Sequence, residues 1–160
     1  MKITVCPGTF DPVTLGHIDI ILRAKANADK LIVGVAEAND SKKLLFSLEE
    51  RIDFLKSALS DKNDIIVESF DSLVVKFARK YKASAIVRGL RAVSDFEHEF
   101  QMAQLNKELA PEIETVFIMA KPEYGYLSSS AVKEIALYGG DVSNWVPETV
   151  KKALEVKAVK

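Results

Sequence analysis

Short apolar runs alternate with longer amphipathic stretches along this chain. Five of the runs are rich in valine and isoleucine and apolar at consecutive positions, which is typical of strands buried on both faces of a parallel sheet. The predicted strands are "KITVC" (2–6), "KLIVGVA" (30–36), "DIIVES" (64–69), "ASAIVRG" (83–89) and "ETVFIMA" (114–120). Amphipathic patterns between and after them predict helices over 17–28, 48–59, 72–82, 95–109, 129–138 and 147–157.

This alternation predicts a single α/β domain over 1–160, built from βα units with right-handed crossovers. We expect a Rossmann-like open parallel sheet of five strands in the order 3-2-1-4-5, with helices on both faces and a C-terminal helical pair. Capping boxes are predicted where Ser47 is followed by Glu50 and where Ser94 is followed by Glu97. In this strand order, the first and fourth strands flank the switch point at which such sheets bind ligands.

Composition narrows the possible functions. The chain has 22 basic and 23 acidic residues and a net charge of −1, which argues against a nucleic-acid partner and against a membrane-surface patch. Its one cysteine, Cys6, excludes an internal disulfide and is expected in the core. The sequence contains neither a run of roughly 20 apolar residues nor an export-type N-terminal segment, so we expect a cytoplasmic protein without a membrane partner.

The connection after the first predicted strand reads "PGTFDPVTLGH" and holds more unusual residues than a short turn needs. Gly8 and Gly16 allow a ligand to approach the backbone, and Thr9 adds a hydroxyl group. A helix beginning at His17 would offer unpaired N–H groups to an anion. The glycines and prolines are also ordinary turn formers, and His17 alone could be a solvated or capping residue, so the motif by itself leaves both interpretations open.

Positive side chains follow two of the other strands. Lys42 and Lys43 come after the second strand, and Arg88 and Arg91 come at the end of the fourth. All would project from the same edge of the sheet as His17. In a nearly neutral chain, this concentration of cationic donors predicts a ligand with several phosphates.

Three serines, 128–130, open the helix that follows the fifth strand. One of them is expected as the N-cap, which is the usual role of serine at such a position. The remaining hydroxyl groups and the adjacent N–H groups could cradle a further phosphate, and both interpretations stay open on the residues alone.

These motifs carry a resemblance to a known family. Thr14-Leu15-Gly16-His17 resembles the (H/T)-x-G-H signature of the nucleotidyltransferase superfamily, and the three serines with Lys133 resemble its I-S-S-T-x-x-R motif. Within the superfamily, the chain resembles the bacterial phosphopantetheine adenylyltransferases over essentially its whole length, at "PGTFDPVTLGHIDI", "SKK", "RGLRAVSDFEHE", "SSSAVKE" and "YGGDVSNWVPE". Departures are Cys6 in place of a frequent aromatic residue, Leu15 in place of asparagine, and a slightly longer loop "EANDSKK".

The resemblance implies adenylyl transfer from ATP to 4′-phosphopantetheine, giving dephospho-coenzyme A and pyrophosphate by in-line attack without a covalent intermediate. It implies His17, Thr9 and Lys42 as catalytic residues, Lys42 being chosen over Lys43 because it directly follows Ser41. The residues that it implies for phosphopantetheine binding are Thr9, Lys42, Val74, Arg88, Met102, Asn106 and Glu134. Those that it implies for ATP binding are Thr9, Phe10, His17, Gly89, Leu90, Arg91, Glu99, Tyr124, Gly125, Tyr126, Leu127, Ser128, Ser129 and Ser130.

Partners and cofactors follow from the same resemblance. It implies a homohexamer, Mg²⁺ delivered with ATP, and coenzyme A as a candidate feedback inhibitor. The sequence shows no carboxylate cluster that would hold the magnesium by itself. The helix dipole favours a neutral His17 whereas bound phosphates favour its protonated form, so the sequence leaves its charge state open.

Two other functions remain as alternatives. One is another nucleotidyltransferase, acting on nicotinamide mononucleotide or glycerol phosphate, which Lys133 and "RGLRAVSDFEHE" disfavour. The other is a non-catalytic nucleotide-binding module, which has no evident need for Thr9 and His17 together.

His98 is expected to face solvent. Met102, Leu105 and Asn106 share one helix face, which could pack in the core or lie beside the pantetheine arm.

Overall fold

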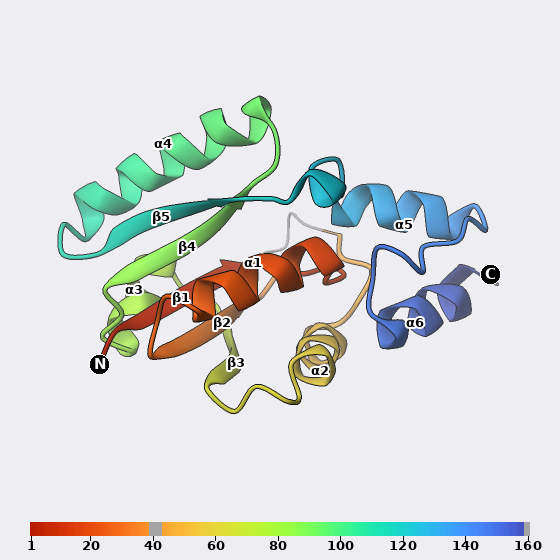
Figure 1. Cartoon of the computed structure of the whole chain (residues 1–160), viewed down its shortest axis with the longest axis horizontal. Coiled ribbons are helices and arrows are strands. Elements are labelled where there is room, and N and C mark those ends of the chain that lie inside the picture. Colours follow the sequence, from red (N-terminus) through yellow and green to blue (C-terminus); the bar gives the residue numbers. More distant parts are fainter. Residues whose placement is uncertain (39–42, 159–160) are drawn as a thin grey trace.

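Five parallel strands form one open sheet in the computed structural model, which describes residues 1–38 and 43–158 (Figure 1). The strands are β1 (Ile3–Gly8), β2 (Lys30–Ala36), β3 (Ile65–Phe70), β4 (Ala85–Leu90) and β5 (Glu114–Met119). Their order is β3-β2-β1-β4-β5, which confirms the predicted topology. The continuous apolar runs fit a parallel sheet, because the central strands are buried on both faces.

Within 1–38 and 43–158, six α-helices and one short 3₁₀ helix connect and flank the strands. They are α1 (Leu15–Lys25), α2 (Leu48–Ala58), α3 (Val74–Lys80), α4 (Val93–Leu109), η1 (Pro122–Tyr124), α5 (Ser129–Leu137) and α6 (Glu148–Ala158). Within the described residues, no helix is long and apolar enough to cross a membrane.

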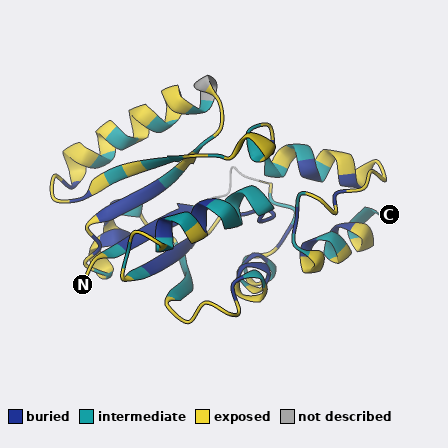
Figure 2. Cartoon of the chain, viewed as in Figure 1, coloured by how far each residue is buried: buried dark blue, intermediate teal, exposed yellow. Residues whose placement is uncertain are grey.

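The core lies on both faces of the sheet, as the alternation along β2 illustrates. Leu31 and Val33 join a cluster with α1, α2 and the C-terminal helices, whereas Ile32 between them joins a cluster with α3. Figure 2 shows these buried strands at the centre of the molecule and an exposed outer side of α4. Leu105 and Leu109 of α4 are about half exposed.

Strands β1 and β4 separate toward their carboxyl ends, and this separation opens the site. β1 pairs with β2 along its whole length, but it pairs with β4 only at Thr4↔Ala85 and Val5↔Ile86. Beyond Val5 the two strands diverge at the switch point of the sheet order. The sequence therefore predicted the place of the crevice through the order of the strands.

Three helices begin two residues away from their predicted starts, and one of these is α3, which begins at Val74 rather than at 72. α1 begins at Leu15 rather than at His17, because the Thr14 side chain caps it and His17 occupies its third position. α4 begins at Val93 with Ala92 as its N-cap and no side-chain capping bond, so the predicted capping box of Ser94 is not at the helix start. The capping box of Ser47 at the start of α2 is confirmed.

The first strand also runs further than expected. Pro7 and Gly8 belong to the end of β1, where the sequence equally allowed them to be turn formers. At the other end of the chain, the carbonyl oxygen of Trp145 accepts a hydrogen bond of 2.8 Å from Leu15 N–H, which docks the segment before α6 on the start of α1. The C-terminal helices thus support the helix that follows the first strand.

Candidate active site

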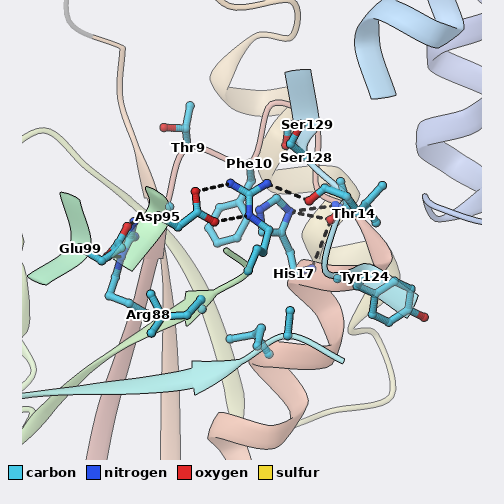
Figure 3. A pocket seen from close by; sticks show the side chains of 18 of the residues that line it. Thr9, Phe10, Thr14, His17, Arg88, Asp95, Glu99, Tyr124, Ser128 and Ser129 are labelled. Atoms are coloured by element: carbon cyan, nitrogen blue, oxygen red, sulfur yellow. Dashed lines mark hydrogen bonds and ion pairs between the residues drawn. The ribbon is translucent and has the colours of Figure 1, made fainter. Parts of the chain in front are cut away.

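A cavity of about 560 Å³ occupies the crevice between β1 and β4 (Figure 3). Its walls come from the end of β1, the start of α1, the end of β4, one face of α4, and the segment that leads into α5. The connection after β1, the residues at the end of β4 and the three serines at the start of α5 therefore meet at one place. We call residues 8–17, which run from the last residue of β1 to the first turn of α1, the opening loop.

The opening loop folds tightly around an aromatic ring. Phe10 is buried and has a φ of 51°, a conformation that is uncommon for a residue with a side chain. Its ring lies against Gly8, where an added Cβ would come within 2.8 Å of Phe10 Cζ. The same ring meets the imidazole of His17 edge to face, with 5.2 Å between the ring centroids. Gly8 is thus needed for close contact with the ring.

His17 is held by Thr14 in a reciprocal capping box. The backbone N–H of Thr14 donates to His17 Nδ1 at 3.0 Å, and the N–H of His17 donates to Thr14 Oγ1 at 3.2 Å (Figure 3). Since Nδ1 accepts a backbone hydrogen, the proton of the neutral imidazole is on Nε2. Burial, with added repulsion from Arg91 and then Arg88, lowers the pKa of His17 to about 4. The unliganded site therefore holds a neutral imidazole at pH 7.

Distant elements fix the rest of the opening loop. Asp11 is buried and accepts hydrogen bonds from the N–H groups of Leu45 and Phe46, each at 2.9 Å. Its carboxylate also forms an ion pair with Lys133, whose Nζ lies 2.9 Å from Oδ2. Ser129 Oγ donates to the carbonyl oxygen of Pro12 at 2.7 Å. Both α5 and the segment before α2 are thereby attached to this loop.

Two arginines from the end of β4 line the cavity, and both are paired with carboxylates of α4. Arg88 donates to Glu99 through Nε at 2.7 Å and Nη2 at 2.6 Å, and through Nη1 to the carbonyl oxygen of Pro7 at 2.7 Å. Arg91 donates through Nε to Asp95 at 2.9 Å and through Nη1 to the carbonyl oxygen of Leu127 at 2.8 Å. Because each positive charge is already balanced, a phosphate would have to share or replace these carboxylates.

A second cavity of about 260 Å³ adjoins the first. Its own walls include the apolar side chains of Phe70, Val74 and Met102 together with Asn106. Both cavities are lined by Pro7, Gly8, Thr9, Arg88, His98 and Glu99. The Arg88–Glu99 pair and Thr9 thus lie where the two cavities meet, so that two ligands bound in them would come together there.

One face of α4 forms a continuous wall along both cavities. The lining residues of this α4 wall are Asp95, His98, Glu99, Met102, Ala103 and Asn106, which follow the spacing of three and four residues of a single helix face. Met102 and Asn106 therefore line a cavity rather than the core, whereas Leu105 is 51% exposed. His98 is exposed, as expected, but it also lines both cavities.

The structure brings together most of the residues that the resemblance implied. The large cavity is lined by Thr9, Phe10, His17, Arg88, Gly89, Leu90, Arg91, Glu99, Tyr124, Leu127, Ser128, Ser129 and Ser130, and the second by Val74, Met102 and Asn106. Gly125, Tyr126 and Glu134 are not among the residues that line either cavity. Lys42 lies outside the described residues, and Lys43 is exposed and lines neither cavity. Ser128 is the N-cap of α5 and accepts from Ala131 N–H at 3.1 Å, so that this expectation is confirmed.

Sequence reasoning missed several residues of the site. The pairing of Arg91 with Asp95 had a signal, since opposite charges four residues apart often meet at a helix start. Thr14 also had a local signal, because threonine is a usual N-cap and its partner His17 lies only three residues further along the chain. Asp11 and Arg51 had none, because the groups that they contact lie far away in the chain. Cys6 is buried as expected, and it lines the large cavity, where burial raises the pKa of its thiol to about 11.

The described residues offer no resident metal site. No group of three or more histidine, cysteine, aspartate or glutamate side chains gathers anywhere in 1–38 and 43–158. The carboxylates at the large cavity, Asp95 and Glu99, are each engaged by an arginine, and Asp11 is engaged by Lys133. These donors do not fit a divalent cation held by the protein alone.

Comparison with known proteins extends the likeness to the whole chain. A family model described as cytidylyltransferase-like matches residues 5–135. The phosphopantetheine adenylyltransferase of Caldanaerobacter subterraneus subsp. tengcongensis is 54% identical over 157 residues, covering 98% of this chain and 98% of that protein. Proteins of the same name from Moorella thermoacetica (53% identity, 96% of each chain) and Clostridium perfringens strain SM101 (46% identity, 99% of this chain and 96% of the relative) are similar over comparable lengths.

Proposed function

This chain belongs to the phosphopantetheine adenylyltransferases, and from that premise we propose how its two adjoining cavities carry out the transfer. The adenylyl group of ATP passes to the phosphate of 4′-phosphopantetheine, and the products are dephospho-coenzyme A and pyrophosphate. The observation that carries the proposal is the junction of the cavities at Thr9 and Arg88, because an in-line displacement needs the two substrates to meet end to end.

The large cavity suits the nucleotide. The first turns of α1 and α5 line it through Gly16, Ser129 and Ser130, and helix N-termini favour anions; Arg91 lines the same space. The second cavity suits the acceptor, because Val74 and Met102 offer apolar contacts to a pantetheine arm and Asn106 offers an amide. Arg88 between them would bind the acceptor phosphate.

His17 acts in this proposal as a neutral hydrogen-bond donor. Its Nδ1 is occupied by the Thr14 N–H, so that Nε2–H is the group available to a ligand. The attacking phosphate is already an anion and needs no general base. A fixed donor at the α-phosphoryl group would stabilise the negative charge that accumulates on it in the transition state. Thr9, on the other side of the opening loop, would orient the attacking phosphate.

The shape of the second cavity separates this acceptor from the alternatives. Nicotinamide mononucleotide and glycerol phosphate carry no long flexible arm that would use the apolar side chains of Phe70, Val74 and Met102. A non-catalytic nucleotide-binding module would need only the large cavity. The presence of a second, partly apolar cavity joined to the first therefore favours a two-substrate transferase with an extended acceptor.

A pyrophosphate-release assay tests the proposal. The protein is given magnesium and ATP together with 4′-phosphopantetheine, nicotinamide mononucleotide or glycerol phosphate, and CTP replaces ATP in a parallel series. We expect pyrophosphate only with ATP and 4′-phosphopantetheine, and regeneration of ATP when dephospho-coenzyme A and pyrophosphate are supplied. Release with another acceptor and none with phosphopantetheine would contradict the assignment.

Other properties remain proposals that rest on the family resemblance. We propose that Mg²⁺ arrives on the triphosphate, so that a chelator abolishes turnover. We propose a homohexamer, for which light scattering that reports a monomer at working concentration would be contradictory. Four further expectations also stay predictions: feedback binding of coenzyme A, a cytoplasmic location, the acceptor lysine at position 42, and ligand contacts of Gly125, Tyr126 and Glu134.

A further inference from the structure

Arg51, in the first turn of α2, is among the largest fully buried side chains of the described residues. It is 2% exposed, and the neighbouring helix residues Phe54 and Leu55 belong to the hydrophobic core. Removing a guanidinium group from water is costly unless its donors are satisfied. A leucine or methionine would occupy such a place more cheaply, so the role of Arg51 has to be found in its contacts.

Those contacts join two strand ends. Arg51 Nη1 donates to the carbonyl oxygen of Thr9 at 2.8 Å and to the carbonyl oxygen of Ala36 at 2.8 Å. Thr9 directly follows β1, and Ala36 is the last residue of β2. A single nitrogen atom thus fixes the beginning of the opening loop against the end of the neighbouring strand. β1 and β2 are already paired up to Gly8↔Val35, so Arg51 continues the connection where backbone pairing stops.

The ion pairs of this region do not explain Arg51. In the part of the chain that the structure describes, no carboxylate forms an ion pair with it, and its Nε is buried without a hydrogen-bond partner. Asp11, the buried carboxylate nearby, is bonded to Leu45, Phe46 and Lys133 instead. Burial lowers the pKa of Arg51, while Asp11, Glu37 and Glu49 act in the opposite direction. Within the described residues, Arg51 donates its hydrogen bonds to the two carbonyl oxygens.

Both carbonyl groups stand beside the reaction site. Thr9 lines the large cavity and the second cavity, and Ala36 lines the second. The next residue, Phe10, has its φ of 51° and its ring against Gly8, so the backbone around Thr9 is in a conformation that its own sequence does not favour. A hydrogen bond from a rigid element to the carbonyl oxygen of Thr9 counteracts relaxation of this backbone.

We propose that Arg51 is a positioning residue that sets the place of Thr9 at the junction of the two cavities, and so the alignment of the acceptor phosphate. The inference rests on the proposed function, because it assigns Thr9 to the acceptor. Arg51 lines neither cavity and acts through the backbone of Thr9. A small displacement of the attacking group strongly slows an in-line reaction. Replacing Arg51 should therefore lower turnover and acceptor binding more than ATP binding.

The test uses Arg51→Met, which keeps an unbranched apolar stem and removes the donors, and Leu55→Ala as a matched control. Leu55 is fully buried on the same helix and lies in the core, so its truncation destabilises the fold without touching Thr9. For folded Arg51→Met we expect kcat/KM for phosphopantetheine to fall by about 30-fold or more, with the Kd for ATP changed less than about threefold. Folded Leu55→Ala should keep kcat/KM within about twofold while its Tm falls.

A double-mutant cycle with Thr9→Ala then asks whether Arg51 acts through Thr9. We expect the loss caused by Arg51→Met to shrink at least about fivefold in the Thr9→Ala background, because the group that it positions is gone. Equal losses in both backgrounds, or a change in Arg51→Met no larger than that in Leu55→Ala, would overturn the inference. Should Arg51→Met not fold, Arg51→Gln is measured in the same way and the same results decide. If the wild-type protein is inactive with phosphopantetheine, the proposed function is wrong. If the wild type is active but the losses in kcat/KM of Arg51→Met and Thr9→Ala simply add in the double variant, only the role of Arg51 is wrong.

Discussion

The opening loop and the α4 wall face each other across the same cavity, yet they are held in different ways. The loop is fixed by buried contacts from α2, α5 and the segment before α2, among which the Asp11 carboxylate is only 4% exposed. The α4 wall is attached through Arg88–Glu99 and Arg91–Asp95, whose arginine side chains are 36% and 40% exposed and whose carboxylates are 12% and 28% exposed. Buried networks are stiff, whereas ion pairs that water reaches on one side can exchange partners at a lower cost in free energy.

This difference suggests a division of labour. Transition-state stabilisation requires donors that are fixed before the reaction, and His17 is on the loop that distant elements hold. Binding and release of phosphates require cations that can change partners, and water reaches the Arg88 and Arg91 side chains of the partly exposed pairs. The predictions below test whether the loop governs turnover and the α4 side governs affinity.

The largest effect is expected from His17→Ala. Removal of a preorganised donor should lower kcat by about 10²–10³-fold and leave the Kd for ATP largely unchanged, because the lost bond matters most in the transition state. Steady-state kinetics and an equilibrium titration with ATP measure the two quantities. A near-normal kcat with a raised KM would make His17 a ground-state ligand and would remove the distinction between the two sides.

The second effect is acid sensitivity of the unliganded loop. The pKa of His17 is about 4 in the folded protein and near 6.5 when unfolded, so the folded state favours the neutral form. The protein should therefore lose stability as the pH falls from about 6.5 to 4, by up to roughly 2–3 kcal/mol. Urea unfolding of the wild type and of His17→Gln at several pH values measures the loss of stability that His17 causes. An unchanged difference between the two proteins over that range would show that the imidazole is not held neutral.

Replacing Arg88 and replacing Arg91 should weaken the binding of different substrates. Arg88→Ala, like Lys42→Ala, should weaken phosphopantetheine binding by about 1.5–3 kcal/mol, since Arg88 lines both cavities. Arg91→Ala should weaken ATP binding instead, because Arg91 lines only the large cavity. Equilibrium titrations of each variant with each substrate separate the cases. Equal weakening of one substrate by both arginine variants would contradict the assignment of the two cavities.

A smaller effect is expected from tight packing in the loop. In Gly8→Ala the new methyl group would lie 2.8 Å from the buried ring of Phe10, and we expect a loss of about 1–3 kcal/mol in the free energy of unfolding. Gly125→Ala is the matched control, since its nearest atom would be 3.5 Å away and its φ is −62°. Thermal unfolding compares them. Similar Tm values for the two variants would mean that the loop is not rigidly packed.

The smallest effect concerns the uncapped start of α4. Ala92 has the extended backbone of an N-cap but offers no side-chain acceptor. Ala92→Ser should stabilise the protein by about 0.5–1 kcal/mol, whereas Thr14→Ser, at the capped start of α1, should change stability little. Denaturant unfolding of both variants is the measurement. A loss of stability in Ala92→Ser would show that the α4 start is already optimised without a cap.

The sequence by itself determined the sheet and the place of the crevice. Apolar runs of β-branched residues and the amphipathic stretches between them are local patterns, and they led to the strand order and to the loops after β1 and β4. Local chemistry also identified Ser47 and one of the serines 128–130 as helix caps, because a cap bonds within three residues. The site residues were reached through the motifs that carry the family resemblance.

Only the tertiary structure decided how those residues are held. The tautomer of His17 depends on the backbone N–H of Thr14, which turns toward it at the start of α1, two residues earlier than the pattern suggested. The bond from Arg51 to Thr9 and the pair of Lys133 with Asp11 join residues far apart in the chain, so no local pattern encodes them. A buried polar group takes its partner from whatever element the fold brings beside it, and burial is what makes that partner obligatory.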